Sequence, residues 1–159
     1  MYKLFVMDVD GTMTDGKVYM SSQGEAFKAF DVKDGYGIKH ILPQLGIKPV
    51  IITGRYSEIV KRRAEELDIK LLFQGVGDKR TVLEELMKQE KCTLSEVAYV
   101  GDDLNDLECI EAVGFSACPQ DAYYILKNKV DYVACCRGGN GAIREVIDFI
   151  QKSLICGGK

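Results

Sequence analysis

Hydrophobic and polar positions follow two alternating periods along the chain. Short, nearly continuous apolar runs recur, and longer stretches with apolar residues every three or four positions lie between them. Continuous apolar runs of this length are typical of parallel strands that are covered on both faces. We therefore expect strands over residues 3–7, 48–53, 70–74, 97–101, 114–118 and 131–135.

The stretches between these runs predict helices. Ser57 and Asp78 each stand just before an amphipathic stretch, in the position of an N-cap. Pro43 interrupts a helical pattern over 37–45 and should kink or end that helix. Regular alternation of strand and helix is typical of an open, doubly wound α/β sheet. Further helices are expected over 58–67, 79–89 and 143–154.

Residues 17–30 do not follow this alternation of strand and helix. Two alternating runs flank a Ser-Ser-Gln-Gly turn there, which predicts a β-hairpin inserted after the first strand. No repeat, low-complexity tract or linker is visible elsewhere. We therefore expect a single domain over 1–155, built on a mainly parallel sheet, with a frayed tail over 156–159.

Composition and charge limit the classes of partner. Hydrophobic residues make up 47% and charged residues 28% of the 159 residues, and the net charge is −3. These values are ordinary for a globular protein and give no reason to expect nucleic acid or a membrane as a partner. The six cysteines form no C-x-x-C pair. A reduced, cytoplasmic protein without a signal segment is the simplest expectation.

Carboxylates follow two of the predicted strands. Asp8 and Asp10 end the first one, and Asp102, Asp103 and Asp106 follow the fourth. The carboxyl ends of parallel strands meet at one edge of a sheet, where α/β proteins bind their ligands. Buried carboxylates without a positive partner are costly. Several such oxygens at one point suit Mg²⁺, which keeps some of its water and accepts a phosphate oxygen.

Phosphate-binding donors follow two other elements. Thr53 and Gly54 end the second predicted strand, and Lys79 begins a helix. A hydroxyl, backbone N–H groups and an ammonium group suit phosphate oxygens. Asp8 can then attack phosphorus and form an aspartyl-phosphate. Asp10, kept protonated by the charge beside it, can donate a proton to the leaving oxygen and later accept one from water.

Each of these features has an ordinary structural explanation when taken alone. A D-x-D sequence occurs on many solvated loops, Asp102 and Asp103 could form a turn with a helix N-cap, and Lys79 could be a surface lysine. Their order at the ends of separate strands favours a phosphate site. A non-enzymatic phosphoacceptor of the receiver type and a non-catalytic scaffold are the alternatives. A receiver would need its acidic pair after the first strand and its phosphoacceptor Asp after a later one, whereas here the adjacent pair Asp102 and Asp103 comes late.

Four segments resemble the motifs of the haloacid dehalogenase superfamily of phosphohydrolases: "DVDGTMTDG", "IITGR", Lys79 and "VGDDLND". The resemblance implies a nucleophile at Asp8 and an acid/base group at Asp10. It also implies Mg²⁺ held by Asp8, Asp102 and the backbone carbonyl of Asp10. The remaining implied roles are phosphate binding by Thr53, Gly54 and Lys79, and support of the metal site by Asp103 and Asp106.

The segments "DGYGI", "FQGVGDK" and "GGNGAIREV" extend the resemblance to phosphatases of 3-deoxy-D-manno-octulosonate 8-phosphate (KDO 8-phosphate). Phosphatases of nine-carbon acids, KDN 9-phosphate and N-acylneuraminate 9-phosphate, are close to them. The resemblance implies that Arg63 binds the carboxylate of the sugar acid. Arg55 and Glu66 differ from the residues typical of the nine-carbon branch, which favours KDO 8-phosphate. Without the resemblance, Arg63 would be assigned to the solvated face of a charged helix.

The gaps between the motifs exclude a cap domain. Only 42 residues separate Asp10 from Thr53, and 25 separate Thr53 from Lys79. Capless members of the resembling group are homotetramers in which a neighbour's hairpin covers the site, and residues 17–30 match that hairpin. The loop over 137–141 could close near the substrate or form a tight turn before the last helix.

Overall fold

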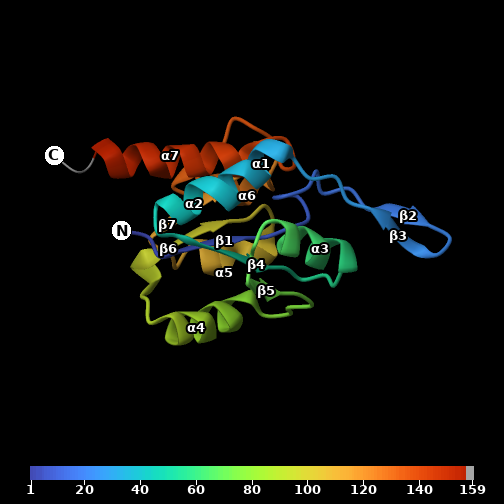
Figure 1. Ribbon diagram of the computed structural model, residues 1–159, viewed down its shortest axis with the longest axis horizontal. Coiled ribbons are helices and arrows are strands. Elements are labelled where there is room, and N and C mark those ends of the chain that lie inside the picture. The colour runs from blue at the N-terminus through green and yellow to red at the C-terminus, as the bar shows by residue number, and fades with distance from the viewer. Residues whose placement is uncertain (157–159) are drawn as a thin grey trace.

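The computed structural model describes residues 1–156 and contains a six-stranded parallel sheet in the order β5-β4-β1-β6-β7-β8 (Figure 1). All six expected strands are confirmed, and each is slightly shorter than predicted. The expected doubly wound α/β fold is therefore confirmed. The strands are β1 (Leu4–Met7), β4 (Lys48–Ile52), β5 (Leu71–Phe73), β6 (Val97–Val100), β7 (Phe115–Cys118) and β8 (Tyr132–Val133).

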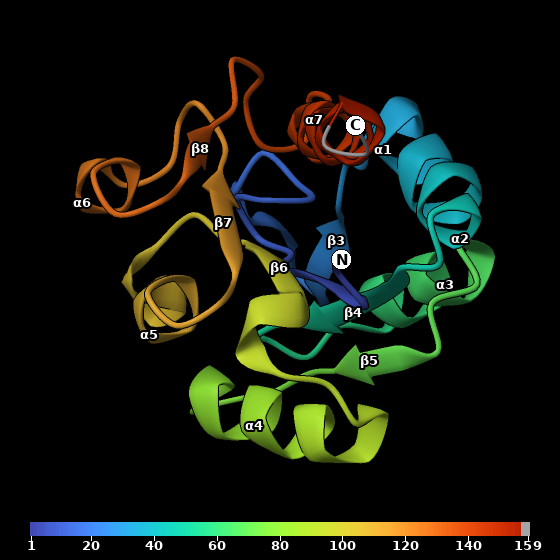
Figure 2. The same ribbon diagram turned by 90° about the vertical axis from the view of Figure 1, so that its left-hand side faces the viewer.

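Helices cover both faces of this sheet, as Figure 2 shows. One face packs against α1 (Val32–Tyr36), α2 (Leu42–Gln44), α3 (Glu58–Glu66) and α7 (Ala142–Cys156). The other packs against α4 (Lys79–Glu90), α5 (Leu107–Ile110) and α6 (Tyr124–Lys127). The two apolar cores so formed explain why the strands are apolar at consecutive positions. Among the described residues, no helix is long and apolar enough to cross a membrane.

Strand β1 shows how this pattern builds the site. Leu4 and Val6 belong to one apolar core and Phe5 and Met7 to the other, and all four are fully buried. In the parallel register, Met7 is level with Ile51 of β4 and Val100 of β6. The residues that follow these three strands therefore emerge side by side at the carboxyl edge of the sheet.

The two predicted N-caps behave differently. Asp78 caps α4 as expected, because its carboxylate accepts a hydrogen bond from the Thr81 N–H at 3.0 Å. Ser57 stands before α3, but its side chain makes no capping hydrogen bond. Its hydroxyl donates instead to Oε2 of Glu25 at 2.5 Å. Ser57 thus occupies the predicted N-cap position, but a contact with the hairpin uses the hydroxyl that was expected to cap the helix.

Pro43 alters its helix through the turn that precedes it. Between α1 and α2, residues Gly37–Ile41 form a wide π-helical turn in which the Leu42 N–H bonds to the Gly37 carbonyl. Such a turn accommodates a residue without an N–H, and the helix ends at Gln44. At the other end of the chain, α7 continues through Cys156. The rest of the predicted tail, 157–159, lies outside the described residues.

The predicted hairpin is confirmed as a separate two-stranded sheet of β2 (Tyr19–Ser21) and β3 (Gly24–Phe27). It projects from the main body in Figure 1. The rings of Tyr19 and Phe27 stack across the strands with centroids 4.4 Å apart. The described residues contain no cap domain, which confirms the expectation from the short gaps between motifs.

Candidate active site

A cavity of about 260 Å³ opens at the carboxyl edge of the sheet. Its walls come from the residues that follow β1, β4 and β6, as the register requires. The structure thus brings together most of the residues that the sequence predicted for a phosphate site. The lining residues are Asp8, Asp10, Thr53, Gly54, Arg55, Asp102, Asp103, Leu104 and Asn105.

Lys79 provides the positive partner for the buried carboxylates. Its Nζ lies 2.7 Å from Oδ1 of Asp8 and 2.7 Å from Oδ1 of Asp106. The Lys79 side chain is 2% exposed. Burial disfavours the charged form of this lysine, but the two carboxylates outweigh that effect and raise its pKa. Lys79 therefore stays protonated and fixes the orientation of Asp8.

One ammonium group does not compensate all of the acidic groups. Carboxylate oxygens of Asp8, Asp102 and Asp106 lie within 4.8 Å of one another. Burial and the charge of Asp106 raise the pKa of Asp8, against the opposing effect of Lys79. Burial, followed by the charges of Asp8 and Asp106, also raises the pKa of Asp102. A divalent cation bound among them would relieve this shortage of positive charge.

The hydrogen bonds indicate which carboxylates of this cluster are free to bind a metal ion and which one holds the others in place. Oδ1 of Asp106 accepts from Lys79 and from the Tyr99 hydroxyl, at 2.7 Å each, and its Oδ2 accepts from the Asp102 N–H at 3.1 Å. Oδ1 of Asp102 accepts a hydrogen bond from the Thr12 hydroxyl at 3.0 Å, and neither Lys79 nor Tyr99 donates to this carboxylate within the described residues. Asp8 and Asp102 therefore fit a hard cation, and Asp106 supports both of them.

Asp103 has a more local role than Asp106. It is exposed, and its carboxylate accepts a hydrogen bond from the Leu104 N–H at 2.7 Å, which caps the short turn Leu104–Asp106. Asp106, by contrast, is fully buried. Of the two supporting residues expected from the sequence, Asp106 is the one that contacts Lys79.

Gly11 allows the first and fourth motifs to approach each other closely. It has a φ of +94°, and a Cβ at this position would lie 2.0 Å from Oδ2 of Asp102. The peptide that joins Asp10 to Gly11 thus lies beside the Asp102 carboxylate. This proximity fits a cation held by Asp8, Asp102 and the backbone at Asp10.

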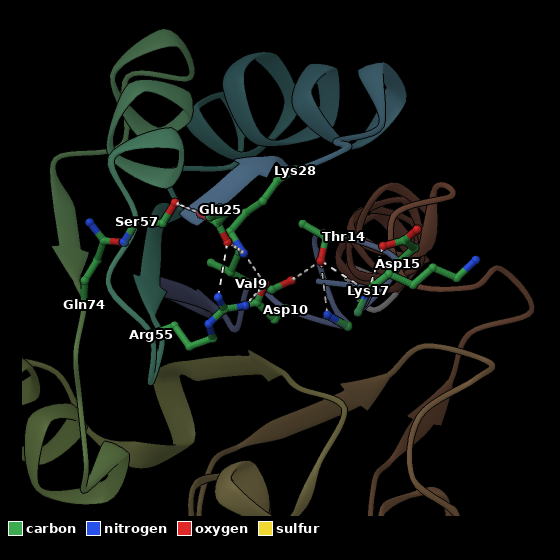
Figure 3. A network of polar contacts seen from close by, with 12 residues as sticks. Val9, Asp10, Thr14, Asp15, Lys17, Glu25, Lys28, Arg55, Ser57 and Gln74 are labelled. Carbon is green, nitrogen blue, oxygen red and sulfur yellow. Dashed lines mark hydrogen bonds and ion pairs between the residues drawn. The ribbon is translucent and has the colours of Figure 1, made fainter. Parts of the chain in front are cut away.

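Asp10 has different surroundings from those expected. The sequence suggested that Asp8 and Asp10 crowd each other, but the carboxylate that raises the pKa of Asp8 is Asp106. Oδ1 of Asp10 forms ion pairs with Lys28 of the hairpin and, at 3.8 Å, with Nη1 of Arg55 (Figure 3). The hairpin thus brings a cation to Asp10, which the sequence did not indicate.

Arg63 and Glu66 lie outside this cavity. They line a separate hollow of about 250 Å³ between α1 and α3. There, Nη1 of Arg63 lies 2.8 Å from Oε2 of Glu66, and its guanidinium group stacks over the ring of Phe30 at 5.5 Å. Of Arg55, Arg63 and Glu66, which the resemblance relates to substrate recognition, only Arg55 lines the cavity within the described chain.

The glycine-rich loop over 137–141 packs against the turn that follows Asp10. The Gly139 N–H donates to the Thr12 carbonyl at 3.2 Å. A Cβ on Gly138 would lie 2.0 Å from the Gly11 carbonyl oxygen. The loop therefore gives close backbone support to the turn that follows Asp10, a role that neither of the two interpretations of the sequence named.

Sequence reasoning missed Lys28, Glu25, Thr12 and Tyr99. Lys28 and Glu25 belong to the hairpin, and no spacing in the sequence indicates that they turn toward Asp10. Thr12 lies within the first motif, and Tyr99 within β6, where it was counted only as an apolar strand residue. The contact of the Tyr99 hydroxyl with Asp106 could be predicted only from the strand register, which the sequence does not give.

Comparisons with known proteins agree with this site. A family model for haloacid dehalogenase-like hydrolases matches residues 72–146. The chain is 45% identical to a KDO 8-phosphate phosphatase of Yersinia pestis over 93% of this chain and 79% of that protein. It is 44% identical to one of Haemophilus influenzae over 95% of this chain and 83% of that protein.

A crystal structure of the Moraxella catarrhalis KDO 8-phosphate phosphatase, in complex with a magnesium ion, a phosphate ion and KDO, matches the fold with a TM-score of 0.92. That match has 45% identity and covers 96% of this chain and 87% of the other. Identity at this level over nearly the whole chain joins the evidence of the four motifs and their convergence on one cavity. The chain belongs to the haloacid dehalogenase-like hydrolases, in the family of the KDO 8-phosphate phosphatases, which are phosphoric monoester hydrolases.

Proposed function

We propose that this chain hydrolyses KDO 8-phosphate to KDO and inorganic phosphate through an aspartyl-phosphate on Asp8, with Mg²⁺ as cofactor. The observation that carries the proposal is the buried carboxylate of Asp8, fixed by Lys79 at 2.7 Å on the wall of a cavity that Thr53 and Asp102 also line. The names of relatives at 43–45% identity support the substrate.

The reaction has two balanced steps. An oxygen of Asp8 attacks phosphorus, the bond from phosphorus to the sugar oxygen breaks, and the sugar oxygen takes a proton from Asp10. Water then attacks the phosphorus of the aspartyl-phosphate and gives a proton to Asp10, and the bond between phosphorus and Asp8 breaks. Inorganic phosphate leaves, and Asp8 and Asp10 return to their starting states.

The residues that meet the phosphate and the metal are distinct. Lys79 supplies positive charge to the phosphate oxygens, and the Thr53 hydroxyl and the Gly54 N–H orient them. Asp8, Asp102 and the Asp10 carbonyl would hold Mg²⁺. When bound, this ion supplies positive charge that stabilises the charge developing on the phosphoryl oxygens.

The eight-carbon sugar acid is favoured over the nine-carbon acids because Arg55, which lines the cavity, differs from the residue typical of the nine-carbon branch. KDN 9-phosphate and N-acylneuraminate 9-phosphate are the alternatives. Arg63 and Glu66 line another hollow. If they bind substrate directly, they do so at the cavity of another copy of the chain in the proposed homotetramer.

The test is phosphate release in the presence of Mg²⁺, with kcat/KM compared between KDO 8-phosphate and KDN 9-phosphate. We expect a clear preference for KDO 8-phosphate, abolished in Asp8→Asn. A preference for the nine-carbon substrate would keep the mechanism and overturn the substrate. No release from either by a folded protein saturated with Mg²⁺ would overturn the proposal and favour a phosphoacceptor or scaffold.

A further inference from the structure

Lys28 is a buried lysine that the mechanism above does not use. It follows β3 at the base of the hairpin, and its side chain is 2% exposed. Its ammonium group forms ion pairs with Oδ1 of Asp10 and, at 2.9 Å, with Oε1 of Glu25. A lysine this deeply buried stays charged only where carboxylates compensate it. The sequence between the first two motifs thus places a fixed cation on the acid/base residue.

The two carboxylate oxygens of Asp10 differ in their contacts. Lys28 and Arg55 both lie on Oδ1. Within the described residues, Oδ2 makes no hydrogen bond or ion pair, and Asp10 lines the cavity. The carboxyl group is therefore held by one oxygen, which leaves the other to exchange a proton with the substrate.

Glu25 fixes Lys28 in turn (Figure 3). Its Oε1 also lies 3.4 Å from Nη2 of Arg55, and its Oε2 accepts the Ser57 hydroxyl. The Ser57 N–H donates to the side-chain oxygen of Gln74 at 3.0 Å. The hairpin is thereby joined to the segments that follow β4 and β5, from the same edge of the sheet as the cavity. A network with every member paired is rigid, so it can set the direction of the Asp10 carboxyl group.

We propose that Lys28 is a positioning residue for proton transfer by Asp10, and that Glu25 keeps Lys28 in place. Lys28 holds Oδ1 so that Oδ2 points to the oxygen that leaves phosphorus. This inference rests on the acid/base role of Asp10 in the proposed function. It makes the base of the hairpin part of the catalytic apparatus of its own chain.

The test uses two substrates that differ in their need for a proton. The sugar oxygen of KDO 8-phosphate leaves poorly as an alkoxide, whereas the phenolate of p-nitrophenyl phosphate leaves without protonation. General acid catalysis contributes about 10²–10⁴-fold, and misplacement of the acid loses a part of it. For Lys28→Met we expect kcat/KM to fall roughly 100-fold on KDO 8-phosphate and less than about 5-fold on p-nitrophenyl phosphate. Lys28→Arg should restore part of the loss.

Three further variants separate the possible causes. Asp10→Asn should show the same selective loss, and larger, which tests the proposed function separately from Lys28. Glu25→Gln should show a smaller loss of the same kind, and it serves if Lys28→Met does not fold. Lys129→Met removes an exposed ion pair with Glu111 at 2.8 Å and should leave both rates unchanged.

Equal losses on both substrates in Lys28→Met and Glu25→Gln, with a selective loss in Asp10→Asn, would overturn the inference and leave the proposed function intact. Equal losses in Asp10→Asn as well would overturn the acid role of Asp10 and the inference with it.

Discussion

At the scale of single residues, the site depends on contacts too close for an ordinary side chain. Gly11 is the clearest case, because any Cβ there would collide with Asp102 and because its φ of +94° is strained for other residues. Gly101 is similar, since a Cβ would lie 2.4 Å from Cγ of Asp106. These glycines let three separate acidic residues converge on one point.

Gly11→Ala should therefore weaken Mg²⁺ binding by about 10-fold to 100-fold, because Asp102 has to move away from the new methyl group. The affinity can be measured by isothermal titration calorimetry. Gly46→Ala is a matched control, since Gly46 also has a positive φ but its Cβ would meet no atom within 4 Å. An unchanged affinity in Gly11→Ala would contradict this explanation.

Removal of Lys79 should reduce stability as well as activity. Lys79→Met leaves Asp8 and Asp106 buried without their cation, and breaking such a buried pair costs about 3–5 kcal/mol. We expect the free energy of unfolding, measured in urea with chelator present, to fall by about that amount at neutral pH. The loss should shrink at lower pH, where Asp8, whose pKa burial raises, can be protonated. A loss that is the same at all pH values would argue against an electrostatic cause.

The convergence of the cavity-lining residues could be predicted because each follows a strand with a clear apolar pattern. Asp8, Thr53 and Asp102 needed only the rule that parallel strands end at one edge of the sheet. Lys28 and Tyr99 could not be predicted in this way. Their polar atoms reach the site by tertiary contacts that leave no mark on local periodicity.

At the scale of elements, the N-terminus of α7 is held by a carboxylate from another helix. Asp34 of α1 is 3% exposed, and its Oδ1 accepts the Arg144 N–H at 2.8 Å. Its Oδ2 is buried without a hydrogen-bond partner. Burial raises the pKa of Asp34 to about 6, although the bond from Arg144 acts in the opposite direction. The charged form of Asp34 is thus disfavoured in the native state relative to the unfolded chain.

This raised pKa predicts the direction of a pH dependence. Between the ordinary value of 3.8 and about 6, the native state binds more protons at Asp34 than the unfolded state does. The contribution of Asp34 to stability should therefore decrease as the pH rises through this window, by about 3 kcal/mol in total.

The difference in free energy of unfolding between the natural protein and Asp34→Asn isolates this contribution. It should change by that amount between pH 4 and pH 7 in metal-free urea titrations. Parallel curves for the two proteins would contradict the assignment to Asp34.

Element types were predictable where periodicity was strong, and element ends were not. The six strands and the hairpin follow from runs of apolar or alternating residues. Ser57 makes no capping hydrogen bond because its hydroxyl bonds to Glu25, 32 residues earlier in the chain. The π-helical turn before Pro43 was likewise not visible, since the sequence indicates only that the proline disturbs the helix.

At the scale of the whole molecule, the fold explains why the catalytic groups meet but not how the site is covered. The predicted sheet brings the ends of β1, β4 and β6 together. Arg63 was predicted to bind substrate but lies in a hollow of its own, because helix α3 carries it away from the cavity mouth. A single chain thus leaves two of the predicted binding groups, Arg63 and Glu66, outside the cavity.

The projecting hairpin bears on the predicted homotetramer. Val18, Met20 and Phe27 are 51%, 64% and 53% exposed. Apolar side chains gathered on a projecting element are typical of a surface that another chain covers. We expect the protein to elute with four times the mass of one chain in size-exclusion chromatography with light scattering.

Met20→Glu should shift this mass toward smaller species, because a buried charge without a partner is unfavourable in an interface. It should also lower kcat/KM for KDO 8-phosphate, since a less covered site admits more water around the phosphate. Ile155→Glu, which places the same charge on an exposed residue of α7, is the control and should change neither quantity. A natural protein that runs as a single chain at full activity would show that the cavity works without a neighbour, with the hairpin acting only through Lys28 and Glu25.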